Sequence, residues 1–296
     1  RVRAAAGPEI DAIAMVVKIN QKDHSQGHIC PDTEKWLRLG PSGIRRDAEA
    51  HLASAPEEQR DFYRSIALSM EGAEAFMRRY AKLAAQMYAE TGKENLREVS
   101  RICEKLASHP PESYHEALQA TWFLFVILQM EGNASSFSPG RMDQYLYPHY
   151  LRSREGGMTF EEALELTEGL WLKFNQIVYL RNSNSAKYFA GFPIGFNVAI
   201  GGQRADGSDA SNELSYLFLK AQDHLLLPQP NMSLRMYRNS PQSLVEAAVR
   251  VIGKGSGIPQ VFNDESVIPA LELHGVSHED AMNYAIVGCV ELTTHG

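Results

Sequence analysis

The spacing of apolar positions divides the chain into a helical first part and a mixed second part. Apolar side chains recur every three or four residues through much of 1–180, which is typical of helices that bury one face. The stripes predict helices over 45–92, 93–107, 112–129 and 159–176, a helical stretch over 10–19, and a loop over 21–43 with one helical piece around Trp36. Pro110 and Pro111 fit the end of the second long helix.

From about residue 190 short apolar segments alternate with helical ones. Segments bounded by glycine, proline or asparagine predict strands over 192–202, 231–237, 258–263 and 284–292. Helical spacing between them predicts helices over 212–224, 240–253 and 265–273. Strand–helix alternation over 190–296 favours an α/β fold with a largely parallel sheet. Four strands are too few to close a barrel, so they would form part of one or an open sheet.

The last predicted strand carries the most informative chemistry, the segment Gly288-Cys289-Val290-Glu291. In an extended chain Cys289 and Glu291 point to the same side, about 7 Å apart by strand rise. A thiol there can do one-electron or nucleophilic chemistry, and a carboxylate can accept a proton. A cysteine among apolar residues is more often a small core residue than a catalyst, so four residues alone do not establish an enzyme.

Composition narrows the function classes without choosing among them. The 296 residues are 44% hydrophobic and 22% charged, as in ordinary globular proteins. A net charge of −7 gives no electrostatic case for nucleic acid or an anionic membrane as a partner. The three cysteines are far apart and form no CxxC pair, which argues against a disulfide framework or a metal site and fits the reducing cytoplasm.

Four segments, in order along the chain, carry a family resemblance. They are 27–35 (GHICPDTEK), 138–150 (SPGRMDQYLYPHY), 257–265 (GIPQVFNDE) and 288–291 (GCVE). Together they resemble the glycyl radical enzymes of the pyruvate formate-lyase family, in its dehydratase and lyase branches. The resemblance spans nearly the whole chain, so we treat 1–296 as a single domain of this type, incomplete at both ends.

The resemblance implies a fold and a mechanism. The fold is part of a ten-stranded α/β barrel with a mostly helical N-terminal region and the cysteine on a loop at its centre. Cys289 would carry a thiyl radical and Glu291 would act as the base. The family binds no cofactor. Its radical is stored on a C-terminal glycine, which would lie outside this chain, and a separate radical-SAM activating enzyme generates the radical there. The family also implies anaerobic metabolism and a homodimer.

Substrate contacts and departures from the family follow from the same segments. The resemblance assigns substrate binding to His28, Ser135, Ser136 and Phe137, although Phe137 could equally sit in the core. Gly288 stands where pyruvate formate-lyase has a second cysteine, which argues against acyl transfer to coenzyme A. Ser135-Ser136 replaces the His-Ser pair of glycerol dehydratase, which argues against glycerol itself.

Several other residues are interpreted as structural. Arg141 is expected to bridge a buried carboxylate, for which its planar guanidinium is suited. Asp143 is expected to pack or cap, and 263–265 to form a turn with a helix N-cap. Cys30 and Cys103 are expected to be small packed residues.

The sequence supports one leading function and two alternatives. Radical dehydration of a small diol-like substrate is favoured, because a base beside the thiyl suits deprotonation of a hydroxyl. A radical C–C, C–N or C–S lyase such as an arylacetate decarboxylase would need aromatic residues around Cys289 instead of hydrogen-bonding ones. A catalytically inert scaffold is the third reading. The family's Arg-Val-x-Gly-Tyr radical loop is not in this sequence, so the chain alone is expected to be inactive.

Overall fold

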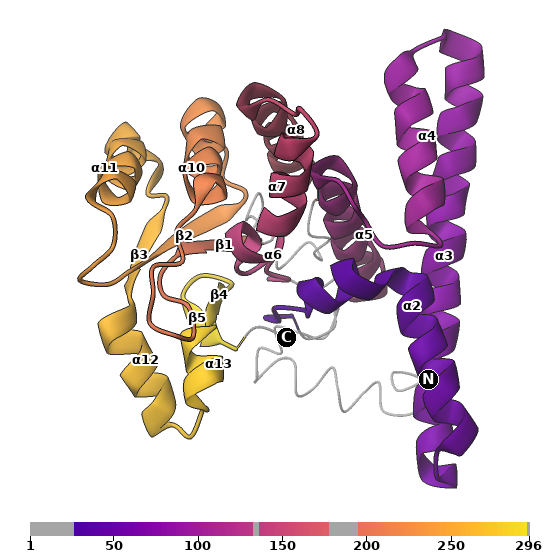
Figure 1. Cartoon of the computed structure of the whole chain (residues 1–296), viewed down its shortest axis with the longest axis horizontal. Coiled ribbons are helices and arrows are strands. Elements are labelled where there is room, and N and C mark those ends of the chain that lie inside the picture. The colour runs from indigo at the N-terminus through magenta and orange to yellow at the C-terminus, as the bar shows by residue number, and fades with distance from the viewer. Residues whose placement is uncertain (1–26, 133–135, 178–194, 295–296) are drawn as a thin grey trace, which may run out of the picture.

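The computed structural model describes residues 27–132, 136–177 and 195–294 (Figure 1). The helices are α2 (Thr33–Ser54), α3 (Glu57–Thr91), α4 (Glu94–Leu106), α5 (Tyr114–Gly132), α6 (Met142–Tyr145), α7 (Tyr147–Glu155), α8 (Phe160–Phe174), α10 (Glu213–Leu225), α11 (Gln242–Val251), α12 (Asp264–Leu273) and α13 (His278–Met282). The strands are β1 (Asn197–Gly201), β2 (Asn231–Met236), β3 (Gln260–Asn263), β4 (Ala285–Val287) and β5 (Glu291–Thr293). The stretch 10–19 and Ser135 lie outside the described residues.

The first helices differ from the prediction at their ends. The predicted helix over 45–92 is wrong as a single element, because the chain is extended at Ala55 and a new helix follows Pro56. Proline lacks a backbone N–H and suits a position where no helical donor is needed. Helix α2 begins earlier than expected, where the Asp32 side chain accepts from the backbone N of Lys35, and it kinks at Gly40 with φ 63°. Figure 1 shows α3 and α4 side by side as an arm at one edge of the molecule.

Strands β1, β2 and β3 form a parallel sheet whose two faces have different partners. Val198, Ile200, Met232 and Leu234 belong to the main hydrophobic core together with side chains of α8, α10 and α11. Figure 1 shows these helices on one side of the sheet, while α12, α13 and the β4–β5 pair lie on the other. The three predicted helices and the strands over 231–237 and 258–263 are confirmed with ends that differ by one or two residues. The strand predicted over 192–202 is confirmed only from Asn197, and all five residues of β1 are buried.

Two isolated bridges continue the parallel arrangement away from β1. Gly140 pairs with Val198 in parallel, and Ile29 pairs in parallel with Phe137. The backbone N of Ile29 donates to Ser136 O at 3.2 Å, and Ser138 N donates to Ile29 O at 2.9 Å. Segments separated by more than 100 residues therefore run alongside one another. The 27–35 segment therefore lies alongside the 137–140 segment, which itself pairs with β1 of the sheet.

The predicted strand over 284–292 is wrong as a single strand. The chain instead forms an antiparallel hairpin in which Val287 pairs with Glu291, so residues 288–290 make a three-residue turn. Gly288 has φ 63°, a left-handed conformation that glycine adopts without steric cost. Figure 1 shows the hairpin beneath the sheet, near the middle of the molecule. The side chains of β4 are fully or almost fully buried, which fixes the hairpin against the sheet.

The architecture therefore matches the expected α/β class, with a mostly helical first part over the described residues. Within the described ranges, none of the helices is both long enough and apolar enough to cross a membrane.

Candidate active site

Cys289 lies at the tip of the β4–β5 hairpin, and its side chain is exposed in this chain. The Glu291 carboxylate folds back onto the tip instead of extending along a strand. Its Oε2 accepts hydrogen bonds from the backbone N of Cys289 at 3.0 Å and of Val290 at 3.1 Å. The structure thus places Cys289 and Glu291 close together, as expected. The reason is the turn at 288–290, and not the alternation of side chains along an extended strand.

Two residues predicted to bind substrate, His28 and Ser136, lie beside this tip although they belong to other segments of the chain. His28 Nε2 lies 3.9 Å from Glu291 Oε1. A Cβ on Gly288 would lie 2.8 Å from Glu291 Oε2 and 2.9 Å from His28 Cδ2, so any larger residue would displace both side chains. A Cβ on Gly195 would lie 2.9 Å from Ser136 Oγ and 3.6 Å from Gly288 Cα. His28, Ser136 and the two glycines are therefore neighbours around the hairpin tip.

The backbone at this site is unusual in conformation as well as in packing. His28 and Ser136 have φ 63° and 67°, and they are two of the three non-glycine residues with positive φ in the described ranges. Such conformations cost about 1–2 kcal/mol for L-residues and cluster at functional sites where the surrounding structure enforces them. Their convergence on Cys289 marks this place as a site held in shape by its neighbours.

The backbone N–H and the backbone carbonyl of Gly288 both make hydrogen bonds to side chains of neighbouring segments. Its N donates to Ser138 Oγ at 3.4 Å. Its carbonyl oxygen accepts from Asn197 Nδ2 at 3.4 Å and Asn231 Nδ2 at 3.2 Å. Sequence reasoning missed these three polar residues. The signals were that Asn197 and Asn231 lie in predicted strands and that Ser138 begins the family segment 138–150.

The surroundings of Glu291 favour its ionised form. Partial burial pushes the pKa of the carboxyl upward, but hydrogen bonds from backbone N–H groups of the hairpin tip and the charge of nearby His28 outweigh it. The net effect holds the pKa of Glu291 below its usual value. The side chain is 53% exposed, so it can reach a molecule placed beside the thiol. Glu291 is thus a carboxylate ready to accept a proton at neutral pH.

Phe137 does not face the hairpin tip. It is 4% exposed and belongs to the main hydrophobic core, whereas Ser138, the next residue, turns toward Gly288. Alternation along an extended segment puts neighbouring side chains on opposite faces. The structure therefore assigns Phe137 to the core, which was the other reading of this residue. Cys30 and Cys103 are buried as expected, and burial raises the pKa of the Cys30 thiol to about 12 and of Cys103 to about 11.

The prediction for Arg141 is wrong in its partner. Its guanidinium donates to the carbonyl oxygens of Gly201, Gln203 and Met282 and to Asn283 Oδ1, and not to a carboxylate. The buried ion pair is made by a different arginine. Arg235 binds Asp264 at 2.9 and 3.0 Å with both residues fully buried. This network, which the sequence did not reveal, sits at the foot of the hairpin.

Tyr284 completes the network at the foot of the hairpin. Its hydroxyl donates to Asp264 Oδ1 at 2.8 Å, and the Arg235 guanidinium lies 3.9 Å from its ring centroid. Arg235 also donates to the carbonyl oxygens of Tyr284 and Met282. The ion pair thus holds the backbone that leads into β4. Asn263, as expected, caps α12 by accepting from Glu265 N.

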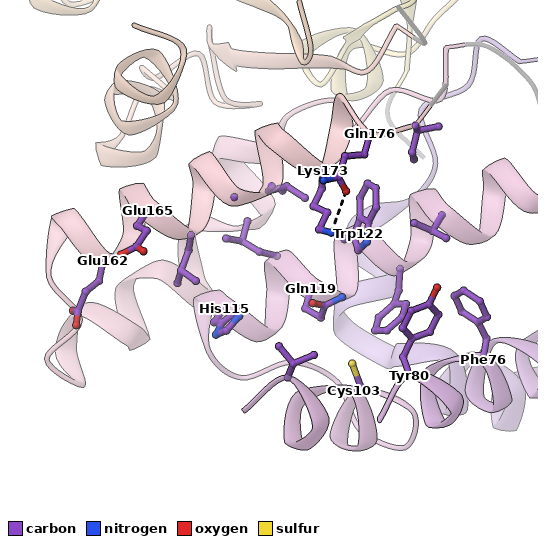
Figure 2. Close-up of a pocket in the computed structure, with 18 of the residues that line it drawn as sticks. Phe76, Tyr80, Cys103, His115, Gln119, Trp122, Glu162, Glu165, Lys173 and Gln176 are labelled. Atoms are coloured by element: carbon purple, nitrogen blue, oxygen red, sulfur yellow. Dashed lines mark hydrogen bonds between the residues drawn. The ribbon is translucent and has the colours of Figure 1, made fainter. Parts of the chain in front are cut away.

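A large cavity among the described residues lies elsewhere. It has a volume of about 1410 Å³ and is lined by residues of α3, α4, α5 and α8, with none from the hairpin. Figure 2 shows Phe76, Tyr80 and Trp122 at one end of it and Glu162 and Glu165 at the other. It is far larger than a site for a small polar molecule needs to be. Over the same described ranges, no three His, Cys, Asp or Glu side chains are grouped to hold a metal ion.

Comparison with known proteins identifies the family of the chain. A model of the pyruvate formate lyase-like family matches residues 1–296. The chain is 38% identical over 286 residues to the probable dehydratase YbiW of Escherichia coli strain K12, covering 91% of this chain and 35% of that protein.

Solved structures give the same result. The glycerol-bound form of the B12-independent glycerol dehydratase from Clostridium butyricum matches with TM-score 0.88 and 36% identity, over 92% of this chain and 36% of that one. A glycyl radical enzyme from Archaeoglobus fulgidus matches with TM-score 0.90 and 30% identity, over 100% of this chain and 40% of that one. The chain spans about a third of the length of the curated relative it matches. The parallel sheet and the segments bridged to it are thus part of the barrel of these enzymes. The chain belongs to the pyruvate formate lyase-like family of glycyl radical enzymes.

Proposed function

We propose that the protein is a glycyl radical dehydratase in which Cys289 carries the thiyl radical and Glu291 is the base, acting on a small diol-like substrate. The observation that carries this proposal is the chemistry around the hairpin tip. His28, Ser136 and Glu291 supply hydrogen-bonding groups beside Gly288, whereas Phe137, the aromatic residue predicted to bind substrate, is buried in the core. A diol needs donors and acceptors for its hydroxyls, and this site offers them.

The proposed reaction balances within the substrate and three side chains. The Cys289 thiyl takes a hydrogen atom from the carbon that bears one hydroxyl, forming an S–H bond and a carbon radical. Glu291 takes the proton of that hydroxyl, which gives a ketyl radical anion. The neighbouring C–O bond then breaks, and the hydroxide leaves as water with a proton from Glu291, either directly or through His28, which gives one proton to the hydroxide and takes one from Glu291. The product radical takes the hydrogen atom back from Cys289, so the thiyl is restored and the substrate has lost water.

The arrangement of the carboxylate suits the base role. The Glu291 carboxyl is ionised at neutral pH, and because its lowered pKa makes it a weaker base than a free glutamate, its position beside Gly288 supports the role rather than its basicity. His28, 3.9 Å from it, is placed to donate a hydrogen bond to the leaving hydroxyl. Ser136, brought to the tip by its left-handed backbone, would bind the other hydroxyl. Ser135, which lies outside the described residues, remains a predicted contact.

The proposed mechanism needs a source for the thiyl radical. We propose a glycine elsewhere in the full-length protein as its store, a radical-SAM activating enzyme as its source, and a homodimer as the working form. A glycyl radical supplies the one hydrogen-atom abstraction that converts the Cys289 thiol to the thiyl. The residues of this chain then bind, orient and deprotonate the substrate.

A decarboxylase or another radical lyase is the alternative within the family. An arylacetate substrate would need aromatic side chains packed around Cys289. Within the described ranges the groups at the tip are polar, which favours the dehydratase.

The test is to activate the native full-length protein anaerobically with its activating enzyme and to record the glycyl radical by electron paramagnetic resonance. Turnover is then measured on a series of short vicinal diols and on arylacetates. We expect loss of water from a diol, abolished in Cys289→Ala and strongly reduced in Glu291→Gln. Cys103→Ala, a buried cysteine remote from the tip, is the matched control and should retain turnover. Carbon dioxide release from an arylacetate would overturn the substrate class, and absence of any radical signal would favour an inert scaffold.

A further inference from the structure

The Gly288 peptide is held by an amide cradle, which we define as the side chains of Asn197, Asn231 and Ser138. Asn197 and Asn231 are register partners on β1 and β2, so their side chains leave the sheet side by side on the same face. Both donate to the same oxygen, the carbonyl of Gly288, at 3.4 and 3.2 Å. Ser138 accepts from the N of Gly288 at 3.4 Å.

The cradle is rigid because its members are fixed through their own backbones. Asn197 O accepts from Gly140 N at 3.0 Å, and Asn231 N donates to Phe196 O at 2.8 Å. The Ser138 hydroxyl also accepts from Asn197 N and donates to Gly195 O, both at 3.3 Å. The three side chains therefore have little freedom to follow the hairpin if it moves. The hairpin must conform to them.

A second observation shows that Asn197 is not explained by stability alone. It is fully buried, and its Oδ1 has no hydrogen-bond partner among the described residues. An unpartnered buried carbonyl oxygen is unfavourable, and an apolar side chain of similar size would avoid it. The Asn197 side chain makes one hydrogen bond to the described part of the chain, the donation to Gly288. Departures from good packing of this kind are expected at functional sites.

We infer that Asn197 and Asn231 are positioning residues. They orient the Gly288–Cys289 peptide and thereby fix the positions of the Cys289 thiol and the Glu291 carboxylate. With the Gly288 carbonyl turned to the two amides, the N–H of Cys289 points away from them and meets the Glu291 carboxylate at 3.0 Å. The orientation of one peptide thus fixes both reacting groups. This inference rests on the proposed function for its catalytic meaning, and on the hydrogen bonds alone for its structural content.

The test compares variants of the cradle with a matched control in the native protein. Asn197→Leu keeps a similar shape without the N–H donor, and Asn231→Ala removes a donor at a half-buried place, where truncation is tolerated if the first variant does not fold. Ser233→Ala is the control, because Ser233 is fully buried two residues along the same face of β2 and its hydroxyl has no partner in the described part of the chain.

Hydrogen exchange of the 288–290 amides is the first readout, because it needs no radical. We expect exchange there to rise about fivefold for each lost donor and about twentyfold in the double variant, since one hydrogen bond contributes roughly that factor to an equilibrium. Exchange in β1–β3 should be unchanged, and Ser233→Ala should leave the tip unaffected. Unchanged exchange at 288–290 in both donor variants would overturn the inference, whatever the enzyme's activity.

Turnover separates positioning from simple stabilisation. In the activated enzyme the donor variants should lose at least tenfold in kcat with little change in KM and with the folded fraction unchanged. Losses that follow the folded fraction alone would contradict a positioning role. If exchange responds as expected but no variant, nor the parent, turns over a diol, the cradle stands and the proposed substrate fails.

Discussion

Replacing Gly288 with alanine tests how tightly the site is packed. The added Cβ would stand 2.8 Å from Glu291 Oε2, so the oxygen must retreat by about 0.6 Å to reach ordinary contact near 3.4 Å. Its hydrogen bonds to Cys289 N and Val290 N, now 3.0 and 3.1 Å, would stretch to about 3.6 Å, beyond useful length. The change thus removes the interactions that hold the carboxylate in place.

The expected loss of stability is modest, and the expected loss of function is large. An L-residue at this left-handed position costs about 1–2 kcal/mol. The neighbouring side chains of His28 and Glu291 are partly exposed, so they can move aside at small additional cost. A displacement of this size at the reacting groups lowers kcat by roughly 100-fold. The pKa of Glu291 should return upward toward its usual value, because the backbone donors that lower it are lost.

Gly92→Ala is the matched control. Gly92 has φ 67°, close to the 63° of Gly288, but a Cβ there would meet nothing within 4 Å. It caps α3, far from the hairpin in Figure 1. Denaturant unfolding should give similar losses for the two variants, and turnover with a carbon-13 titration of Glu291 should distinguish them. If Gly288→Ala keeps both its turnover and its low Glu291 pKa, the packing argument is refuted.

Three further predictions concern burial, thiol reactivity and pH. Arg235→Met leaves a fully buried carboxylate unpaired and should lower the free energy of unfolding by about 3–5 kcal/mol in denaturant titrations; a loss below about 1 kcal/mol would contradict this. Iodoacetamide at pH 8 should label one thiol per folded chain, Cys289, because burial raises the pKa of Cys30 to about 12 and of Cys103 to about 11; mass spectrometry showing fast labelling of either would count against the structure. Since the folded pKa of Glu291 is lowered, its contribution to stability is present above its unfolded pKa and is lost as pH falls through the folded value; Glu291→Gln should flatten that acidic limb, and an unchanged limb would refute the assignment.

The helices and strands were predictable where one physical signal dominates. The stripe over 159–176 gave α8 because its apolar face had to be buried, and Thr159 with Glu162 forms the capping box at its start. The break at Pro56 was missed because apolar spacing continues across it and hides a local change of backbone direction. The same weakness explains the hairpin. Alternation and apolar content are the same in one strand of nine residues and in two strands joined by a turn.

Some residues of the candidate site could likewise be predicted from the sequence, and others could not. Cys289 and Glu291 were predicted from the sequence because they lie in the family segment 288–291, and His28 because it lies in 27–35. Ser136 was predicted because Ser135-Ser136 stands in the place of the His-Ser pair of glycerol dehydratase. Asn197 and Asn231 could not be predicted, since their role depends on register partners 34 residues apart meeting one carbonyl. The Arg235–Asp264 pair was likewise invisible, because charge complementarity across a fold leaves no periodic trace.

The sequence by itself determined the family and the α/β class and pointed to the two side chains proposed to react, because motifs and periodicity are local properties of the chain. Only the tertiary structure decided how these side chains meet. It placed Cys289 on a turn, folded Glu291 onto that turn and turned Phe137 away from it. The physical reason is that buried hydrogen bonds between distant segments, not local preference, set the conformation of the 288–290 backbone.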